Sequence, residues 1–351
     1  MNSVDESWSL IQPVLEGNNL LGFIAIHRGN KAHPAFGATR IEDYPDSQAA
    51  LTDVLNLSSL MSHKAALAGI PYGGGKGVLF NGPHMEDPAK RARALEIYAA
   101  HVDKLGGKFV TGSDAGVSQD DVIILRSHSP HIVGIEEDPT QRTAEGLLGS
   151  IFVTLAHVFG DTDLEKRSFA IQGVGKVGMA VLELIADDAK HIVVADIDES
   201  RVQEAKLKFP HITVVSPDEI LSAEVDVLIP CALGGVLNST SAQHIRAKAV
   251  VGSANNQLHS KEAGDMLHER GILYAPDYVV NAGGLISVVH EYEKSRSGAT
   301  EGDLVHDIAA IQTRLNDIYV KSKENGIPTH RIADTIARLK IESLYPASDL
   351  A

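Results

Sequence analysis

The first part of the chain alternates short apolar runs with one long segment of helical periodicity. Residues 20–27 (LLGFIAIH) and 35–41 (AFGATRI) have the apolar and aromatic content of strands. Residues 46–69 instead repeat apolar side chains at intervals of three and four, which predicts a helix. Asp46 or Ser47, directly after a proline, can act as the N-cap of this helix. We therefore expect strands and a long helix to pack together in this part.

A regular alternation of strand and helix patterns follows a polar, turn-rich stretch at residues 134–146 (GIEEDPTQRTAEG), which reads as an inter-domain connection. The predicted strands are the apolar runs 168–172, 191–196, 212–215, 225–230, 249–253 and 271–276. Helical patterns lie between them, including a helix opened by Ser216 and Pro217. Such alternation indicates right-handed βαβ units and a parallel sheet.

These patterns predict an α/β protein of two domains, a size that 351 residues support comfortably. We expect an N-terminal α/β substrate domain at residues 1–140 and a Rossmann-type, doubly wound dinucleotide-binding domain at residues 141–325. Residues 326–351 read as C-terminal helices that return to the first domain.

Composition narrows the functional classes. The net charge of −15 argues against nucleic acid as the main partner, because phosphate binding needs a basic surface. Cys231 is the single cysteine, so an intrachain disulfide is impossible, which suits a reducing cytoplasm. The acidic N-terminus does not resemble a signal peptide, and no apolar run approaches the ~20 residues of a membrane span. We expect a cytoplasmic protein without a membrane segment.

A dinucleotide-binding motif lies between the predicted strand at 168–172 and the helix after it. Its residues are Gly173, Val174, Gly175, Lys176, Val177 and Gly178, with the G-x-G-x-x-G spacing. The glycines allow a tight turn, close approach of a pyrophosphate and close helix–strand contact. Asp196, about 20 residues on, can bind the adenosine ribose hydroxyls and would repel a 2′-phosphate, so NAD is favoured. The alternatives are a glycine turn without a ligand, and NADP bound with help from Arg201 or Lys206.

Three charged residues in the first half stand out against glycine-rich or apolar surroundings. Lys76 follows three glycines, but Ile70 and Gly77 stand where a P-loop needs a glycine and a hydroxyl residue. A lysine held beside apolar surface has a lowered pKa, which suits a general base. Lys64, near the end of the predicted helix, could be only a solvated surface charge. Asp114, in residues 108–121 (KFVTGSDAGVSQDD), could be only a turn residue after a strand.

Several segments, in order, resemble the successive motifs of the glutamate/leucine/phenylalanine/valine dehydrogenase family, and most closely those of leucine and phenylalanine dehydrogenases. The segments are MSHKAALAGIPYGGGKGV, TGSDAGVSQDD, GVGKVG, CALGGVLN, GSANNQL and YAPDYVVNAGGLISV. The resemblance covers roughly residues 15–345. It implies NAD-dependent oxidative deamination of an L-amino acid to a 2-oxo acid and ammonium, by a homo-oligomer without a metal.

The resemblance also implies residue roles. The lysine matching Lys64 binds the substrate carboxylate, and the lysine matching Lys76 is catalytic. The aspartate matching Asp114 carries protons to and from the amino group. Other matching positions are Gly37 and Met61, which line the site, Asn255, near the nicotinamide, and Asn281, where the two domains meet.

Substrate choice is read from further matching positions. In glutamate-specific members a lysine and a hydroxyl residue hold the side-chain carboxylate, whereas the matching positions here are Phe36 and Val288. Burying a carboxylate against them would cost several kcal/mol. Gly112 and Leu285 line the same region by analogy. We expect an apolar substrate, with leucine, valine or isoleucine favoured and aromatic amino acids next. A glutamate-specific enzyme and a non-catalytic NAD-binding regulator are the remaining alternatives.

Other features have a plainer interpretation. The connection at 136–146 is shorter than is usual in the family and carries Arg142 where a small residue or proline is common, which leaves its contact with substrate or nicotinamide open. His63 replaces a common tyrosine and reads as a packing substitution. Residues 128–131 (HSPH) read as a surface loop and not as a metal site, and Cys231 as a small apolar residue.

Overall fold

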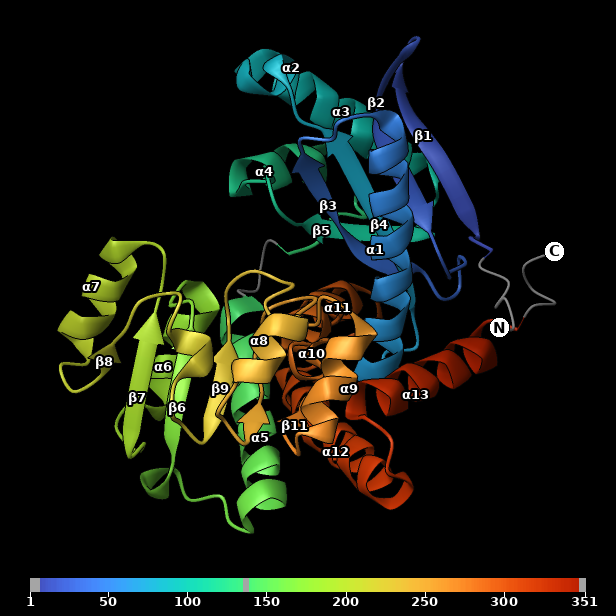
Figure 1. Cartoon of the computed structure of the whole chain (residues 1–351). Coiled ribbons are helices and arrows are strands. Elements are labelled where there is room, and N and C mark those ends of the chain that lie inside the picture. The colour runs from blue at the N-terminus through green and yellow to red at the C-terminus, as the bar shows by residue number, and fades with distance from the viewer. Residues whose placement is uncertain (1–6, 135–138, 347–351) are drawn as a thin grey trace. The chain divides into compact units, whose positions relative to one another are not determined.

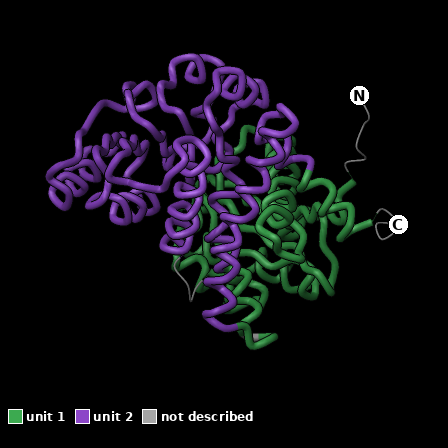
Figure 2. Tube along the Cα trace, turned by 90° about the horizontal axis from the view of Figure 1, so that it is seen from below, with its two compact units in different colours: residues 1–137, 288–299, 336–351 green, residues 138–287, 300–335 purple. Residues whose placement is uncertain are grey.

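The computed structural model describes residues 7–134 and 139–346, the side chain of Ser295 excepted. The chain forms two compact units, each built from separate stretches of sequence and coloured in Figure 2. Unit 1 comprises Met1–Glu137, Val288–Ala299 and Ile336–Ala351. Unit 2 comprises Asp138–Ser287 and Thr300–Thr335. The segment 288–299, which the sequence analysis assigned to the second domain, groups with unit 1.

Unit 1 contains a mixed sheet with the strand order β1-β2-β4-β3-β5 (Figure 1). The strands are β1 (Leu10–Glu16), β2 (Asn19–Ile26), β3 (Ala35–Glu42), β4 (Gly73–Phe80) and β5 (Phe109–Ser113). The pairs β1–β2 and β2–β4 are antiparallel, while β3 is parallel to both β4 and β5. The order places β4 in the interior of the sheet and puts the C-terminal end of β5 beside β3.

Helices cover both faces of this sheet. They are α1 (Ser47–Ala68), α2 (Pro83–Glu86), α3 (Pro88–Lys104) and α4 (Gln119–His128). Helix α1 packs on one face through Ala50 and Val54, and the core on the other face includes residues of α3 and α4. The side chain of Asp46 accepts a hydrogen bond from the backbone N–H of Ala49 (2.8 Å), so Asp46 is the N-cap of α1.

The three consecutive glycines of β4 are needed for packing and not for a ligand loop. A Cβ at Gly74 would overlap the backbone of Met61 and Ser62 in α1. A Cβ at Gly75 would lie 2.7 Å from the ring of Phe109. The absence of side chains therefore lets α1 lie directly on the strand that carries Lys76.

Unit 2 contains a parallel sheet with the strand order β11-β10-β9-β6-β7-β8. The strands are β6 (Ser168–Gln172), β7 (His191–Ala195), β8 (Thr213–Val214), β9 (Val227–Pro230), β10 (Ala249–Val250) and β11 (Leu273–Tyr274). This is the 3-2-1-4-5-6 order of the doubly wound dinucleotide-binding fold. The order reverses between β6 and β9, which is where such sheets bind ligands at their carboxyl ends. The predicted α/β fold class is confirmed.

The helices of unit 2 differ from the sequence prediction in two places. They are α5 (Pro139–Phe159), α6 (Lys176–Ile185), α7 (Glu199–Lys208), α8 (Ser239–His244), α9 (Lys261–Glu269), α10 (Asp277–Val280) and α12 (Glu301–Asn325). Residues 139–146, predicted as a connection, are the first turns of α5, because a proline is tolerated in the first turn and Thr143 and Ala144 face the interior. Residues 135–138 of that connection lie outside the described residues.

The helix expected from Ser216 is only the single 3₁₀ turn η2 (Ile220–Ser222). Ser216 is not its N-cap, which is Glu219; the Ser216 hydroxyl donates to the Glu219 carboxylate (2.7 Å). A longer helix needs an apolar face to stabilise it, and only Ile220 of this turn is buried.

Two further helices contribute residues to both units. Helix α11 (Gly283–Ser297) and helix α13 (Thr329–Leu344) each continue past a unit boundary. In unit 1, Lys340 of α13 donates a hydrogen bond to the carbonyl of Ala66 (3.3 Å), and the hydroxyl of Tyr345 donates to the carbonyl of His33 (3.3 Å). Within the described parts of the chain, the search for a helix long and apolar enough to cross a bilayer finds none.

Candidate active site

Lys76 and Asp114 form a direct ion pair in unit 1. Lys76 lies in the middle of β4, and its residue surface is only 5% exposed. Its ammonium donates a hydrogen bond to Oδ2 of Asp114, the residue directly after β5. The backbone holds Asp114 in place, because its N–H donates to the carbonyl of Thr39 (2.9 Å) and its Oδ1 accepts from the N–H of Ala115 (2.8 Å). The structure thus brings the two predicted catalytic residues together.

Burial and charge shift the protonation of both groups. Burial lowers the pKa of the Lys76 ammonium, and the nearby charge of Asp114 opposes this shift without cancelling it. Burial alone would raise the pKa of Asp114, but the charges of Lys76 and Arg40 and the hydrogen bond from Lys76 hold it below its usual range. The site therefore combines a lysine that releases its proton more easily than usual with a carboxylate that stays ionised.

Further polar and charged side chains, which the sequence analysis missed, lie next to this pair. Nε of Arg40 donates to Oδ2 of Asp114 (3.2 Å), and Nη1 of Arg40 lies 3.5 Å from Oδ2 of Asp53. The hydroxyl of Tyr44 donates to the same Asp53 oxygen (2.6 Å). The sequence contained one indication of Arg40. Side chains alternate along β3, so Arg40 lies on the same face of the strand as Phe36, which was predicted to line the site.

Phe36 is fully buried in an aromatic cluster of unit 1. Its ring centroid lies 4.9 Å from that of Tyr72 and 5.1 Å from that of Tyr292. The hydroxyl of Tyr72 donates to Oε1 of Glu293 (2.7 Å). Phe36 is therefore covered by two tyrosines, which the sequence analysis did not include.

The other predicted substrate residues are distributed as follows. Met61 and Lys64 lie on α1, half-buried. A Cβ at Gly37 would overlap the carbonyl of Gly75, so Gly37 lies against the strand that carries Lys76. A Cβ at Gly112 would lie 3.2 Å from the carbonyl of Val133.

Helix α11 carries the remaining two predicted substrate residues. Leu285 belongs to unit 2 and Val288 to unit 1.

His63, on α1, makes a hydrogen bond from Nδ1 to the carbonyl of Ser59 (3.0 Å), a local contact within the helix.

The G-x-G-x-x-G segment of unit 2 forms a strand–turn–helix at the point where the strand order reverses. Gly173 has a φ of +89°, and a Cβ there would lie 2.8 Å from the Cβ of Ala232, which follows β9. A Cβ at Gly178 would overlap the carbonyl of Gly173. By contrast, the nearest atom to a Cβ at Gly175 would be Nη1 of Arg201, at 3.5 Å. Space is therefore left at the N-cap of α6, where a pyrophosphate would approach.

Asp196 lies at the end of β7, beside this turn. Its Oδ2 accepts a hydrogen bond from the N–H of Val174 (2.9 Å). Arg201 lies 3.4 Å from Asp198 and 4.0 Å from Asp196. Lys206 donates to the carbonyl of Pro210 (2.8 Å) at the far end of α7. The arrangement keeps a carboxylate, with Arg201 as a partial counter-charge, where a ribose would bind.

Asn255 and Asn281, both predicted near the cofactor, contact each other. Nδ2 of Asn281 donates to Oδ1 of Asn255 (2.9 Å) and to the carbonyl of Ser253 (3.2 Å). Oδ1 of Asn281 is buried without a protein partner. A buried, unpartnered acceptor is costly, and a ligand amide would satisfy it. This oxygen and the open N-cap of α6 fit NAD(P).

The remaining sequence features have structural roles. Arg142 lies on α5 and forms ion pairs with Glu145 (3.0 Å) and Glu301 of unit 2, so it is a helix-surface residue and not part of a loop. Burial raises the pKa of the Cys231 thiol, which makes it a poor nucleophile. In the described ranges, no cluster of histidine, cysteine or acidic side chains suits a metal ion.

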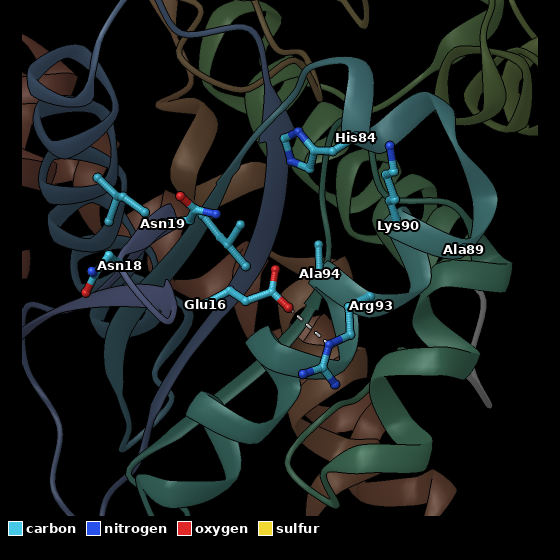
Figure 3. Close-up of a pocket in the computed structure, with 10 residues that line it drawn as sticks. Glu16, Asn18, Asn19, His84, Ala89, Lys90, Arg93 and Ala94 are labelled. Atoms are coloured by element: carbon cyan, nitrogen blue, oxygen red, sulfur yellow. Dashed lines mark hydrogen bonds and ion pairs between the residues drawn. The ribbon is translucent and has the colours of Figure 1, made fainter.

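A pocket of about 630 Å³ lies elsewhere in unit 1, between the β1–β2 hairpin and helices α2 and α3 (Figure 3). Its lining includes Asn19, His84, Lys90 and the Glu16–Arg93 ion pair (3.2 Å). The predicted site residues lie outside it. It is an open hollow with both polar and apolar lining and does not contribute to the Lys76 site.

Comparison with known proteins matches both parts of the chain. The family model described as Glu/Leu/Phe/Val dehydrogenase, dimerisation domain, matches residues 13–130, and the model described as Glutamate/Leucine/Phenylalanine/Valine dehydrogenase matches residues 196–345. A phenylalanine dehydrogenase from Bacillus thermotolerans is 37% identical, over 92% of this chain and 85% of its own length. The chain belongs to the Glu/Leu/Phe/Val dehydrogenase family. It is therefore an amino acid dehydrogenase, an oxidoreductase that uses NAD(P).

Other relatives of this amino acid dehydrogenase differ in their substrates. A leucine dehydrogenase from Bacillus subtilis is 33% identical, over 94% of this chain and 90% of its own length. The crystal structure of L-tryptophan dehydrogenase from Nostoc punctiforme is 37% identical and matches with a TM-score of 0.79 over 92% of both chains. These names establish the class of reaction and leave the choice of amino acid open. The match to a dimerisation domain supports assembly of this dehydrogenase into oligomers.

Proposed function

We propose that this dehydrogenase oxidises an apolar L-amino acid with NAD. The reaction converts the amino acid, NAD⁺ and water into the 2-oxo acid, NADH, ammonium and a proton, and it also runs in reverse. The observation that carries the proposal is the buried ammonium of Lys76 held against Asp114. Such a pair supplies an acid and a base with separated pKa values, which carbonyl–amine interconversion requires.

The residues of unit 1 have distinct proposed roles. Lys64 binds the substrate carboxylate through its fixed positive charge. Lys76, in its neutral form, accepts a proton from the water that attacks the imine carbon, and Asp114 exchanges protons with the substrate nitrogen. NAD, when bound, supplies the hydride acceptor. The lowered pKa of Lys76 supports this role, because it makes the neutral amine more accessible than that of an ordinary lysine.

Residues of unit 2 would hold NAD. The N-terminus of α6, with Gly175 and Lys176, faces the pyrophosphate, and Asp196 binds the ribose hydroxyls. Asn255 and Asn281 bind the nicotinamide end, supported by the unpartnered oxygen of Asn281. The carboxylate of Asp196 favours NAD over NADP, because it repels a 2′-phosphate.

Leucine, valine or isoleucine is the proposed substrate. Phe36 is buried between tyrosine rings and offers no cation for a side-chain carboxylate. An aromatic substrate is the second candidate, favoured by the 37% identity to a phenylalanine and a tryptophan dehydrogenase, against 33% and 35% to two leucine dehydrogenases.

A substrate panel at fixed NAD tests the proposal, with NADH formation followed by absorbance. Branched-chain amino acids should give the highest kcat/KM, followed by phenylalanine and tryptophan, with glutamate inactive. The Lys76→Ala variant should lose nearly all activity and still quench its protein fluorescence on NADH binding. Highest activity with an aromatic amino acid would select the second candidate, and activity with glutamate alone would overturn the apolar assignment.

Assembly and location complete the proposal. We propose a homo-oligomer, supported by the dimerisation-domain match at residues 13–130. Analytical ultracentrifugation of the purified chain should show a species at least twice the 37.5 kDa of one chain. A cytoplasmic location is supported by the single cysteine, which excludes an intrachain disulfide.

A further inference from the structure

Arg40 is shared between two carboxylates, and one of them belongs to the proposed catalytic pair. Its Nε donates to Oδ2 of Asp114 (3.2 Å), and its Nη1 lies 3.5 Å from Oδ2 of Asp53. The Lys76 ammonium donates to the same Asp114 oxygen as Arg40 does. Two cations from neighbouring strands, β3 and β4, therefore share a single oxygen atom.

Asp53 and Tyr44 hold Arg40 from its other side. Asp53 lies on α1, and its Oδ2 accepts a hydrogen bond from the Tyr44 hydroxyl (2.6 Å). The guanidinium thus spans from α1 to the loop after β5. A planar guanidinium presents donors in fixed directions, so it suits this bridging position better than a flexible ammonium does.

The chemistry proposed for Lys76 needs such a group. A carboxylate alone beside Lys76 favours the protonated amine, and a protonated amine cannot accept a proton from water. A permanent cation beside Asp114 balances the carboxylate when Lys76 is neutral. Arg40 can do this because its guanidinium stays charged at every physiological pH.

We propose that Arg40, anchored by Asp53 and Tyr44, is a positioning residue that holds Asp114 ionised and in place, so that Lys76 is the group of the pair that loses its proton. This inference rests on the proposed function of Lys76 and Asp114. It adds to that function the residues that set its pH range. The directions of the pKa shifts agree with this role, since the charge of Arg40 lowers the pKa of both Lys76 and Asp114.

The pH profile of kcat/KM tests this role, because the charges of Arg40 and Asp53 shift the pKa of Lys76 in opposite directions. The groups that face it are Arg40 from β3, Asp53 from α1 and the backbone N–H of Ala115. In Arg40→Gln, loss of a cation should move the acidic limb about one unit to higher pH, since a nearby charge shifts a pKa by ~1–3 units. In Asp53→Asn, loss of an anion should move that limb to lower pH.

The conservative variant Arg40→Lys separates the effect of the positive charge from that of the guanidinium geometry. Arg40→Lys keeps the cation and loses the fixed bridge, so the acidic limb should stay near that of the wild type while kcat falls. Arg93→Gln is the matched control, because Arg93 pairs with Glu16 (3.2 Å) on an exposed part of the same unit. Its profile should be that of the wild type.

The outcomes distinguish this inference from the proposed function. If the wild type oxidises apolar amino acids but Arg40→Gln and Asp53→Asn lose activity equally at every pH, Arg40 is only structural and the inference is overturned. If the acidic limb moved in the same direction in Arg40→Gln and in Asp53→Asn, the inference would be overturned as well. If the wild type oxidises no amino acid, the proposed function fails and the inference falls with it. Thermal unfolding of each variant identifies a loss that comes from misfolding.

Discussion

Two glycine-rich segments, each containing a lysine, use their glycines for different physical reasons. Residues 73–77 (GGGKG) form an interior strand of unit 1, whereas residues 173–178 (GVGKVG) form a strand–turn–helix of unit 2. In the first, glycine is required because other chain segments occupy the space of a side chain. In the second, the backbone requires Gly173 because its φ is +89°, whereas Gly175 adjoins open space and is not required by the packing.

The lysines of the two segments also differ in their surroundings. Lys76 is buried and paired with Asp114, while Lys176 is exposed at the start of a helix. A similar sequence pattern therefore gives a buried, ion-paired lysine in one unit and a solvent-exposed lysine in the other. Burial, and not the neighbouring glycines alone, decides which role a lysine can have.

The largest expected effect separates these lysines. Lys76→Ala should lower kcat by at least ~10²–10⁴-fold, because general acid–base catalysis contributes this much. Lys176→Ala, the matched control for kcat, should leave kcat nearly unchanged at saturating NAD and should change the free energy of unfolding by less than ~0.5 kcal/mol, as expected for an exposed residue. Steady-state kinetics with NAD and the best amino acid would measure kcat in both variants, and chemical denaturation would measure their free energies of unfolding. Comparable loss of kcat in the two variants would contradict the comparison.

The next effect separates the glycines. Gly74→Ala should destabilise unit 1 by ~3 kcal/mol or more, because its methyl group would overlap the backbone of α1, which cannot move like a side chain. Gly175→Ala should fold with nearly unchanged stability and raise the KM for NAD, because its methyl group enters space left for the pyrophosphate. Chemical denaturation and NAD titration would measure the two responses, and a stable Gly74→Ala protein would refute the packing explanation.

Acid should act on unit 1 through His27, a residue that is only 6% exposed. Burial, with smaller contributions from the charges of Arg28 and His63, lowers the pKa of His27 from 6.5 to about 3. The folded state therefore disfavours the protonated form, so stability is complete above pH 6.5 and falls as the pH decreases towards 3. The loss is up to ~1.4 kcal/mol per pH unit.

The His27→Gln variant tests this pH dependence. Glutamine does not titrate and can still form a hydrogen bond with Ser62, which contacts Nδ1 of His27 at 2.9 Å. Denaturation between pH 7 and pH 4 should show a shallower loss of stability in the variant. An identical slope in the two proteins would assign the acid sensitivity to other groups.

The smallest effect is expected at Arg142. Its ion pairs with Glu145 and Glu301 lie on the surface of unit 2, and exposed pairs contribute about 0–1 kcal/mol. Arg142→Ala should leave kcat and both KM values unchanged and lower the stability by less than ~1 kcal/mol. A severalfold rise in the KM for NAD would instead give Arg142 a role in binding.

Local spacing explains what could be predicted from the sequence. The turn at residues 173–178 was predictable because its strand, glycines and helix are adjacent in the chain. Asp46 as a helix cap was predictable for the same reason. Residues 139–146 were not, because their polar composition resembles a connection and only their packing in unit 2 makes them helical.

The surroundings of the candidate site depend on distant pairings. Arg40 reaches Asp114 only because β3 pairs with both β4 and β5. Tyr72 and Glu293 are 221 positions apart in the sequence, and no local pattern links them. The Lys76–Asp114 pair itself was predicted through the resemblance to a family and not through spacing.

The discontinuous composition of unit 1 has a consequence for biosynthesis. Tyr292 covers Phe36, and Tyr345 donates to the carbonyl of His33, 312 positions earlier, so residues 33–36 take contacts from residues that are synthesised much later. Unit 1 therefore completes its packing only after residue 345 has been synthesised. A fragment that stops at residue 134 would keep the contact of Phe36 with Tyr72 and lack the one with Tyr292, which leaves one side of the Phe36 ring uncovered.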